Sequence, residues 1–273
     1  MSTASLSIPV ADRVLDRRIP LGAVRDTLEI TRRNLIVYMR VPQLLIFSTI
    51  QPVIFVLLFR YAFGGAVNLA GFPYPYVDYL MPGIFVQTVV FGSIATAIGM
   101  ATDLKSGLTE RFRALPMSRA AVLAGRTLAD LLRNVFVVTL MMAVGFAVGW
   151  RVHTNIIDLV GAALLVLLFG YAMSWIFAAV GLAVSDPESA QAASFPVLAP
   201  LVFASGAFVP VSSMPGWLQD FANNQPVSIA ASAVRALVVG GPAATDVWHS
   251  IVWDIGIIVV FSLLAVRLYR RAV

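Results

Sequence analysis

The sequence has 273 residues, of which 59% are hydrophobic, 12% are charged and none is cysteine. Water-soluble proteins carry about 25% charged residues, so most of the surface of this chain does not face water. The mean hydropathy of +0.88 agrees with this conclusion. The composition excludes disordered, collagen-like and ordinary soluble proteins, and the lack of cysteine excludes thiolate chemistry and metal sites built on Cys. A polytopic membrane protein remains.

The few charged residues divide the chain into six apolar segments. A transmembrane helix needs about 20 apolar residues to cross about 30 Å of hydrocarbon, and each segment meets this requirement. The segments are continuous rather than alternating, which favours helices over the strands of a membrane barrel. We therefore predict an all-α fold with six spans, at about residues 41–62, 79–102, 127–150, 157–184, 190–211 and 246–267.

The basic residues predict which side of the membrane each segment occupies. Six spans place both termini on the same side, and sixteen of the 19 Lys and Arg residues lie near the termini or around the connection between the second and third spans. Because basic residues concentrate in cytoplasmic segments, we expect both termini in the cytoplasm. This bias also explains the net charge of +5 without nucleic-acid binding.

The first 40 residues divide into a polar cytoplasmic tail, residues 1–20, and an amphipathic helix, residues 21–40. Five apolar residues recur at helical spacing among charged ones: Leu21, Val24, Leu28, Leu35 and Met39. A helix with such a stripe lies on a membrane surface with its apolar side in the interface. We expect it either to anchor the chain or to offer a contact surface to a partner.

The segment between the second and third spans, residues 103–125, combines many charges with one apolar stripe. Leu108, Phe112 and Leu115 share a face of a predicted short helix that Pro116 ends. A solvated loop does not need this stripe. The stripe therefore indicates docking into a groove on another protein, and the alternative is packing on the helix ends of this chain.

The segment before the last span, residues 212–245, is rich in proline and glycine and is predicted on the outer side. It contains two short helical patterns, 216–222 and 227–239, which we expect to form a re-entrant hairpin at the outer leaflet. The hairpin is either an outer gate or, through its tryptophan, an interfacial anchor. The candidate gate residues are Pro215, Trp217, Phe221, Pro226 and Arg235.

Motifs for self-contained chemistry are absent from this sequence. It has no G-x-x-x-x-G-K-[ST] motif for ATP, no H-E-x-x-H metal motif and no G-x-S-x-G nucleophile motif. His153 and His249 are expected as interfacial polar residues rather than ligands or bases. Asp254 is the acidic residue placed deepest in a span, and Asp130 and Arg133 have the spacing to neutralise each other. These features indicate a membrane protein that takes its energy from a partner.

Three stretches of the sequence carry a family resemblance that covers nearly everything after about residue 25. They run from Arg33-Asn34-Leu35 to Phe63-Gly64-Gly65, from Tyr79-Leu80-Met81-Pro82-Gly83 to Gly125-Arg126, and from Phe208-Val209-Pro210 to Gly240-Gly241. In this order they resemble the permease subunits of ABC-2-type transporters, in the daunorubicin-resistance-like branch of bacterial drug and lipid exporters. The resemblance implies a multi-pass protein of the bacterial plasma membrane.

The resemblance also implies a non-catalytic subunit that pairs with a second permease copy or a paralogue. Two separate ATPase subunits would bind ATP and Mg²⁺, and a hydrophobic or amphiphilic drug, antibiotic or lipid would be exported from the cytoplasm or inner leaflet. In that family the loop after the second span is the coupling helix. Carried onto this chain, the coupling residues are Glu110, Arg111, Phe112, Arg113, Leu115 and Arg119, with Glu29 and Arg33 of the interfacial helix beside them.

Two other classes of function stay open at this point. One is a secondary transporter or channel that works without ATP and uses Asp254 as its ionisable switch. The other is a membrane scaffold in which residues 103–125 are only a docking site.

Overall fold

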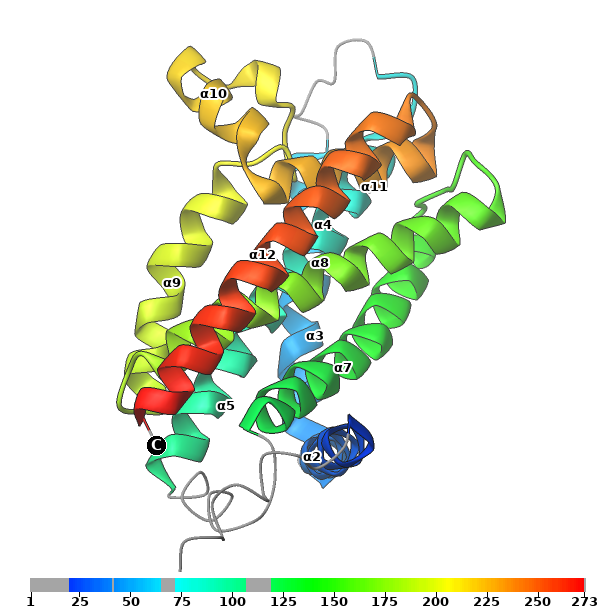
Figure 1. The fold of residues 1–273 in the computed structure, drawn as a ribbon. Helices are drawn as coiled ribbons and strands as arrows, with labels where there is room; N and C mark the ends of the chain where they lie inside the picture. Colours follow the sequence, from blue (N-terminus) through cyan, green and yellow to red (C-terminus); the bar gives the residue numbers. More distant parts are fainter. Residues whose placement is uncertain (1–19, 41, 65–71, 107–118, 273) are drawn as a thin grey trace, which may run out of the picture.

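The computed structural model describes residues 20–40, 42–64, 72–106 and 119–272, and the regular elements of these ranges are helical. The longer helices are α2 (Pro20–Arg40), α3 (Pro42–Leu57), α4 (Tyr76–Gly92), α5 (Ile94–Lys105), α7 (Arg119–Ala147), α8 (Ile156–Leu182), α9 (Pro187–Phe203), α10 (Gly216–Asn224), α11 (Pro226–Val239) and α12 (Ala243–Ala272). A short π-helix, η2 (Leu58–Phe63), continues α3, and a 3₁₀ turn, η3 (Val211–Ser213), precedes α10. We call the end of the bundle with α2 the inner end and the end with α10 the outer end (Figure 1).

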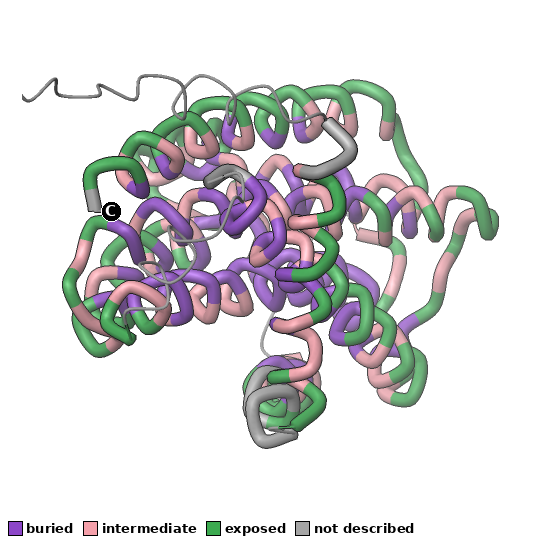
Figure 2. Tube along the Cα trace, turned by 60° about the horizontal axis from the view of Figure 1, so that its bottom comes forward, coloured by how far each residue is buried: buried purple, intermediate pink, exposed green. Residues whose placement is uncertain are grey.

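Helices α4 and α5 form a nearly continuous central helix that is interrupted at Ser93. Every residue of α4 from Tyr76 to Val90 is buried. A helix that is apolar on all sides needs neighbours on all sides, and α4 packs against α3, α7, α8, α9 and α11. Figure 2 shows the buried positions gathered in the interior of the bundle, while the outward faces of the helices are exposed. The central helix therefore sets the positions of the others.

Two glycines allow a close approach to this central helix. A Cβ atom added to Gly83 in α4 would overlap the carbonyl oxygen of Ala207, in the segment after α9. A Cβ atom added to Gly181 in α8 would overlap the carbonyl oxygen of Ala97 in α5. Small residues at such contacts let backbones in a membrane protein pack closely.

Four helical stretches are long and apolar enough to cross a membrane. They are Tyr76–Lys105, Ala121–Ala147, Ile156–Leu182 and Ala243–Arg271. They coincide with the second, third, fourth and sixth predicted spans, so the prediction of a helical polytopic membrane protein is confirmed. Helix α7 begins at Arg119, which makes the last part of the predicted segment 103–125 helical.

The first and fifth predicted spans have less regular forms. Near the N-terminus the apolar helical stretch is Thr49–Ala62, and it changes to π-helix at Leu58. Helix α9 has 17 residues, with Pro196 and Pro200 inside it. A helix of that length rises about 25 Å, which is less than the hydrocarbon thickness of about 30 Å. The total of six spans therefore stays a prediction.

The start of α9 is determined by a side-chain cap. The carboxylate of Asp186 accepts hydrogen bonds from the backbone N–H of Ser189 at 2.9 Å and from its hydroxyl at 2.7 Å. These bonds, the backbone one first, hold the pKa of the exposed Asp186 carboxyl below its usual value. Pro187 follows at the first helical position, where its missing N–H costs nothing.

The close contact between α5 and α8 gives a direct test. Replacing Gly181 with Ala should lower the stability of the protein by about 1–3 kcal/mol, because the new methyl group overlaps the Ala97 carbonyl. Gly256→Ala in α12 is the matched control, since no atom lies within 4 Å of its added Cβ and alanine favours the helix. Thermal unfolding of the purified protein in detergent measures both variants, and equal melting temperatures would contradict the close packing.

Candidate functional site

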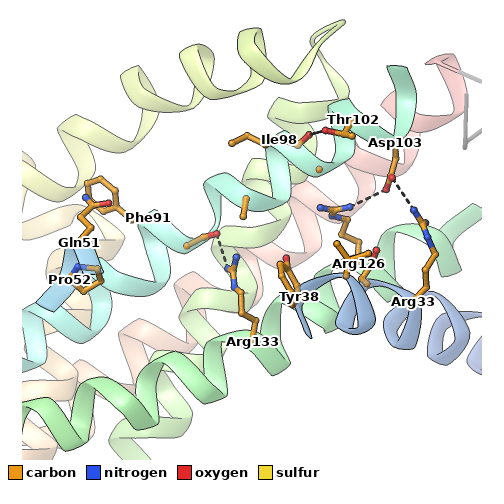
Figure 3. A pocket seen from close by; sticks show the side chains of 15 residues that line it. Arg33, Tyr38, Gln51, Pro52, Phe91, Ile98, Thr102, Asp103, Arg126 and Arg133 are labelled. Atoms are coloured by element: carbon orange, nitrogen blue, oxygen red, sulfur yellow. Dashed lines mark hydrogen bonds and ion pairs between the residues drawn. The ribbon is translucent and has the colours of Figure 1, made fainter. Parts of the chain in front are cut away.

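Three helices are joined at the inner end by one carboxylate. Asp103, near the end of α5, lies 3.4 Å from Nη2 of Arg33 in α2 and 3.1 Å from Nη1 of Arg126 in α7. Figure 3 shows the two arginine side chains approaching Asp103 from different helices. The pair with Arg126 is the better shielded, with both side chains less than one fifth exposed. Asp103 therefore links α2, α5 and α7 through its charge.

A second carboxylate, Asp130 of α7, is fully buried in the same region. It accepts hydrogen bonds from the hydroxyl groups of Tyr38 in α2, at 2.6 Å, and Thr96 in α5, at 2.5 Å. Nη1 of Arg133 lies 3.9 Å from it, and Arg133 also donates to the carbonyl of Gly92 at 2.8 Å. The predicted pairing of Asp130 with Arg133 is confirmed. The burial of Asp130, with hydrogen-bond partners from two other helices, was not predicted.

Together these residues form the inner polar network: Arg33, Tyr38, Thr96, Asp103, Arg126, Asp130 and Arg133. Burial, and after it the charge of Asp130, raises the pKa of Tyr38, so its hydroxyl remains protonated and continues to donate. Removing one partner from such a buried group leaves an uncompensated charge, which destabilises a protein by about 3–5 kcal/mol. The network therefore holds α2 in a defined position.

Helix α2 presents different faces to the protein and to its surroundings. Ile30 and Thr31 are buried against α7, where the Thr31 hydroxyl donates to the Gly125 carbonyl at 3.1 Å. In contrast, Val24 and Met39 of the predicted apolar stripe are 58% and 79% exposed. The helix forms where the sequence predicts it, and its exposed apolar stripe fits a membrane interface. The face of α2 that packs on α7 could not be recognised from the hydropathy pattern of the sequence.

The predicted coupling residues fall mainly outside the described residues. Glu110, Arg111, Phe112, Arg113 and Leu115 belong to residues 107–118, and the side chain of Arg119 is also outside the description. Glu29 is exposed on α2. Arg33 lies against Asp103, close to the point where α5 leads into residues 107–118. The structure therefore places one predicted coupling residue, Arg33, in the inner polar network.

The outer hairpin forms at the predicted residues, as α10 and α11. Pro215 and Pro226 stand at the starts of the two helices. Helix α10 projects from the bundle (Figure 1), with Trp217 75% exposed and Phe221 also exposed. Helix α11 instead buries small residues against α4, α8 and α12. The exposure of Trp217 fits an interfacial anchor better than a closed gate.

Arg235 of α11 holds the segment after α9 against α4. Its guanidinium lies 3.7 Å from the ring centre of Tyr79 and donates to the carbonyls of Tyr79, at 3.1 Å, and Gly206, at 2.9 Å. The hydroxyls of Tyr79 and Tyr76 donate to the carbonyls of Gly206 and Phe208, at 3.2 and 2.9 Å. These bonds satisfy irregular backbone, as apolar surroundings require.

An aromatic cluster lies beside this segment. The Phe208 ring stacks on Phe59 of η2 with 4.8 Å between ring centres, and it also contacts Phe55 and Phe203. We call these four residues the outer aromatic cluster: Phe55, Phe59, Phe203 and Phe208. The cluster joins α3 and η2 to the end of α9. Sequence reasoning missed this cluster because its members are spread over more than 150 positions.

Two other acidic residues differ in how they are satisfied. Asp78 is buried and accepts from the Arg151 backbone N–H at 2.9 Å, and Nε2 of His153 lies 2.8 Å from its other oxygen. His153, predicted as an interfacial polar residue, also stacks on Tyr74. Asp254 in α12 is fully buried, and neither of its carboxylate oxygens has a hydrogen-bond partner among the described residues.

Comparison with known proteins identifies the family. The model of the ABC-2 type transporter family matches residues 25–239. The daunorubicin resistance ABC transporter permease protein DrrB1 of Streptomyces coeruleorubidus is 38% identical over 249 residues, which cover 91% of this chain and 87% of that protein. The probable doxorubicin resistance ABC transporter permease protein DrrC of Mycobacterium tuberculosis is 31% identical over 193 residues, covering 71% and 70% of the two chains.

A more distant relative is the putative transport permease ycf38 of Pyropia yezoensis, which is 27% identical over 216 residues and covers 76% of this chain. The family match covers most of the chain, and it includes the inner polar network and the Arg235 contacts. The resemblance found in the sequence is thereby confirmed. The chain belongs to the ABC-2 type transporter family, as a membrane permease subunit of an ABC transporter.

Proposed function

We propose that this chain forms the transport path of an ATP-driven exporter of hydrophobic or amphiphilic compounds, drugs or lipids among them. It works as one of two permease chains, each a copy or a paralogue of the other, with two separate ATPase subunits that bind ATP and Mg²⁺. The relatives named for daunorubicin and doxorubicin resistance support this class of substrate. Export then proceeds outward across a bacterial plasma membrane, with both termini of the chain in the cytoplasm.

The observation that carries this mechanism is the binding of Asp103 by arginines from two other helices. Residues 107–118 connect α5 to α7 and include five of the predicted coupling residues. Asp103 precedes this segment and Arg126 follows it, and the two are paired at 3.1 Å. A displacement of the segment by the ATPase therefore moves α2, α5 and α7 together. Packed helices respond to such a bias by changing between discrete arrangements.

The central helix extends this movement to the outer end. It runs from Asp103 in the inner polar network to Tyr76 and Tyr79. These tyrosines donate hydrogen bonds to the segment after α9, which Arg235 also contacts. A tilt of α4 and α5 changes both ends at once. In this proposal the outer aromatic cluster separates when the ATPases close, and the substrate leaves between the two permease chains.

Reversing the charge of two predicted coupling residues tests the proposed contact with the ATPase. The double variant Arg111→Glu with Arg113→Glu should still insert into the membrane, but it should lose at least tenfold in ATP-dependent export, because each charge-assisted contact contributes about 1.5–3 kcal/mol. The control is Arg270→Glu with Arg271→Glu, which reverses two exposed charges on the same expected side. Export by the complex reconstituted with its ATPase is measured, and equal activity of both double variants would contradict the assignment.

The orientation is tested by cysteine labelling, which is simple because the chain has no native cysteine. Ser106 and Ser213 are exposed at opposite ends of the bundle. We expect Ser106→Cys to react with a membrane-impermeant maleimide only from the cytoplasm, and Ser213→Cys only from outside. The opposite pattern would overturn the proposed topology.

A secondary transporter driven by an ion gradient is the second candidate function, and Asp254 is the observation that favours it. An acidic residue buried in a membrane helix without a hydrogen-bond partner marks a functional site by default. This alternative requires the chain alone, in liposomes without an ATPase, to move substrate along an ion gradient. The family membership and the Asp103 contacts favour the ATP-driven mechanism.

A further inference from the structure

A cavity of about 430 Å³ lies at the inner end and is lined by residues of α2, α3, α4, α5 and α7. One part of its wall is charged and consists of Arg33, Asp103, Arg126 and Arg133. Figure 3 shows Pro52 and Phe91 at the opposite end of the cavity from Asp103 and Arg126. The cavity therefore has a charged end and a less polar end, where Gln51 lies beside Pro52 and Phe91.

The polar wall of this cavity has more hydrogen-bond donors than acceptors. Nε of Arg126, Nε of Arg133 and Nδ2 of Asn34 are buried and have no hydrogen-bond partner among the described residues. Arg133 and Asn34 are only 5% and 7% exposed. Buried donors without acceptors are uncommon in folded proteins and destabilise them. The three residues that carry these nitrogens line the cavity, although the nitrogens themselves have almost no accessible surface.

The charged side chains of the wall indicate the kind of ligand. Three arginines of the described residues, Arg33, Arg126 and Arg133, lie beside the carboxylates of Asp103 and Asp130. Asp130 already accepts hydrogen bonds from Tyr38 and Thr96, so its charge is compensated less by Arg133 alone. Guanidinium groups match phosphate oxygens in both charge and geometry.

The position of the cavity indicates where the ligand comes from. Val37 of α2 contributes to the wall and is 43% exposed, so the cavity opens along α2. The same helix exposes Val24 and Leu28, whose burial in a membrane interface would place the opening at the depth of lipid headgroups. A ligand that enters there has its phosphate at the arginines and its apolar part toward Pro52 and Phe91.

We propose that this cavity binds the phosphate group, the glycerol backbone and the first acyl carbons of a phospholipid from the leaflet next to α2. Its volume fits the headgroup region and the first part of the chains, and it lies in the size range of small-molecule sites. The site lies within one chain, whereas the proposed export path lies between two chains. The phospholipid is therefore a resident ligand that joins α2 to α5 and α7, and it is distinct from the exported compound.

Lipid binding to the full-length protein in neutral detergent, followed by native mass spectrometry, tests this proposal. The probes are phosphatidylglycerol and diacylglycerol, which carry similar chains and differ in the phosphoglycerol headgroup. Phosphatidylglycerol should be retained at least tenfold better, because its phosphate adds charge-assisted hydrogen bonds to the arginines. Equal retention of the two lipids would overturn the proposal.

Two variants and two matched controls locate the site. Arg33→Gln removes one charge of the wall, and Val37→Trp fills the opening while every charge remains. Each should weaken phosphatidylglycerol binding by about tenfold. The controls are Arg32→Gln and Leu28→Trp, which make the same changes at exposed positions of α2 outside the cavity wall. They should bind normally, and an equal loss in variants and controls would overturn the assignment to this cavity.

Competition by inorganic phosphate distinguishes a lipid from a free phosphate ion. Millimolar inorganic phosphate should not displace phosphatidylglycerol, because it lacks the apolar part that occupies the end near Phe91. Complete displacement would overturn the lipid assignment. The readout requires no ATPase, so failure here leaves the test of the coupling residues unaffected.

Discussion

The inner end of this permease depends on two carboxylates that are shared between helices. Asp103 binds arginines from α2 and α7, and Asp130 binds hydroxyls from α2 and α5 in addition to Arg133. Charged groups inside a membrane protein are costly unless partners compensate them. The position of α2, the junctions on both sides of residues 107–118 and the cavity under α2 all follow from these contacts. The network is thus a structural support for the inner end of the bundle.

The outer end is closed by a different kind of interaction. Arg235 binds backbone carbonyls and the face of Tyr79, and the Phe208 ring stacks among aromatic rings. The stacked aromatic rings can separate without leaving a buried charge unpaired, unlike the inner pairs. This difference fits a subunit whose inner end moves as one unit and whose outer end opens. The central helix, packed closely at Gly83 and against Gly181 of α8, connects the two ends.

Much of the architecture could be predicted because apolar length and turn residues determine it locally. The four long spans and the start of α11 at Pro226 follow from runs of apolar residues and from proline. The packing of α2 on α7 could not be predicted, since it uses Thr31 and the absence of a side chain at Gly125. The partners of Asp130 and Arg235 come from distant parts of the chain, and single-sequence patterns do not show such contacts. Spacing alone revealed the pairing of Asp130 with Arg133, because one helix holds both.

The central claim is that Asp103 couples α5 to α7 across residues 107–118. A double-mutant cycle with Asp103→Asn and Arg126→Gln measures this coupling directly, from the unfolding free energies of the full-length protein and its three variants. We expect a coupling energy of about 1 kcal/mol or more, because the two side chains lie 3.1 Å apart and are mostly shielded from solvent. Strictly additive effects of the two substitutions would contradict the account.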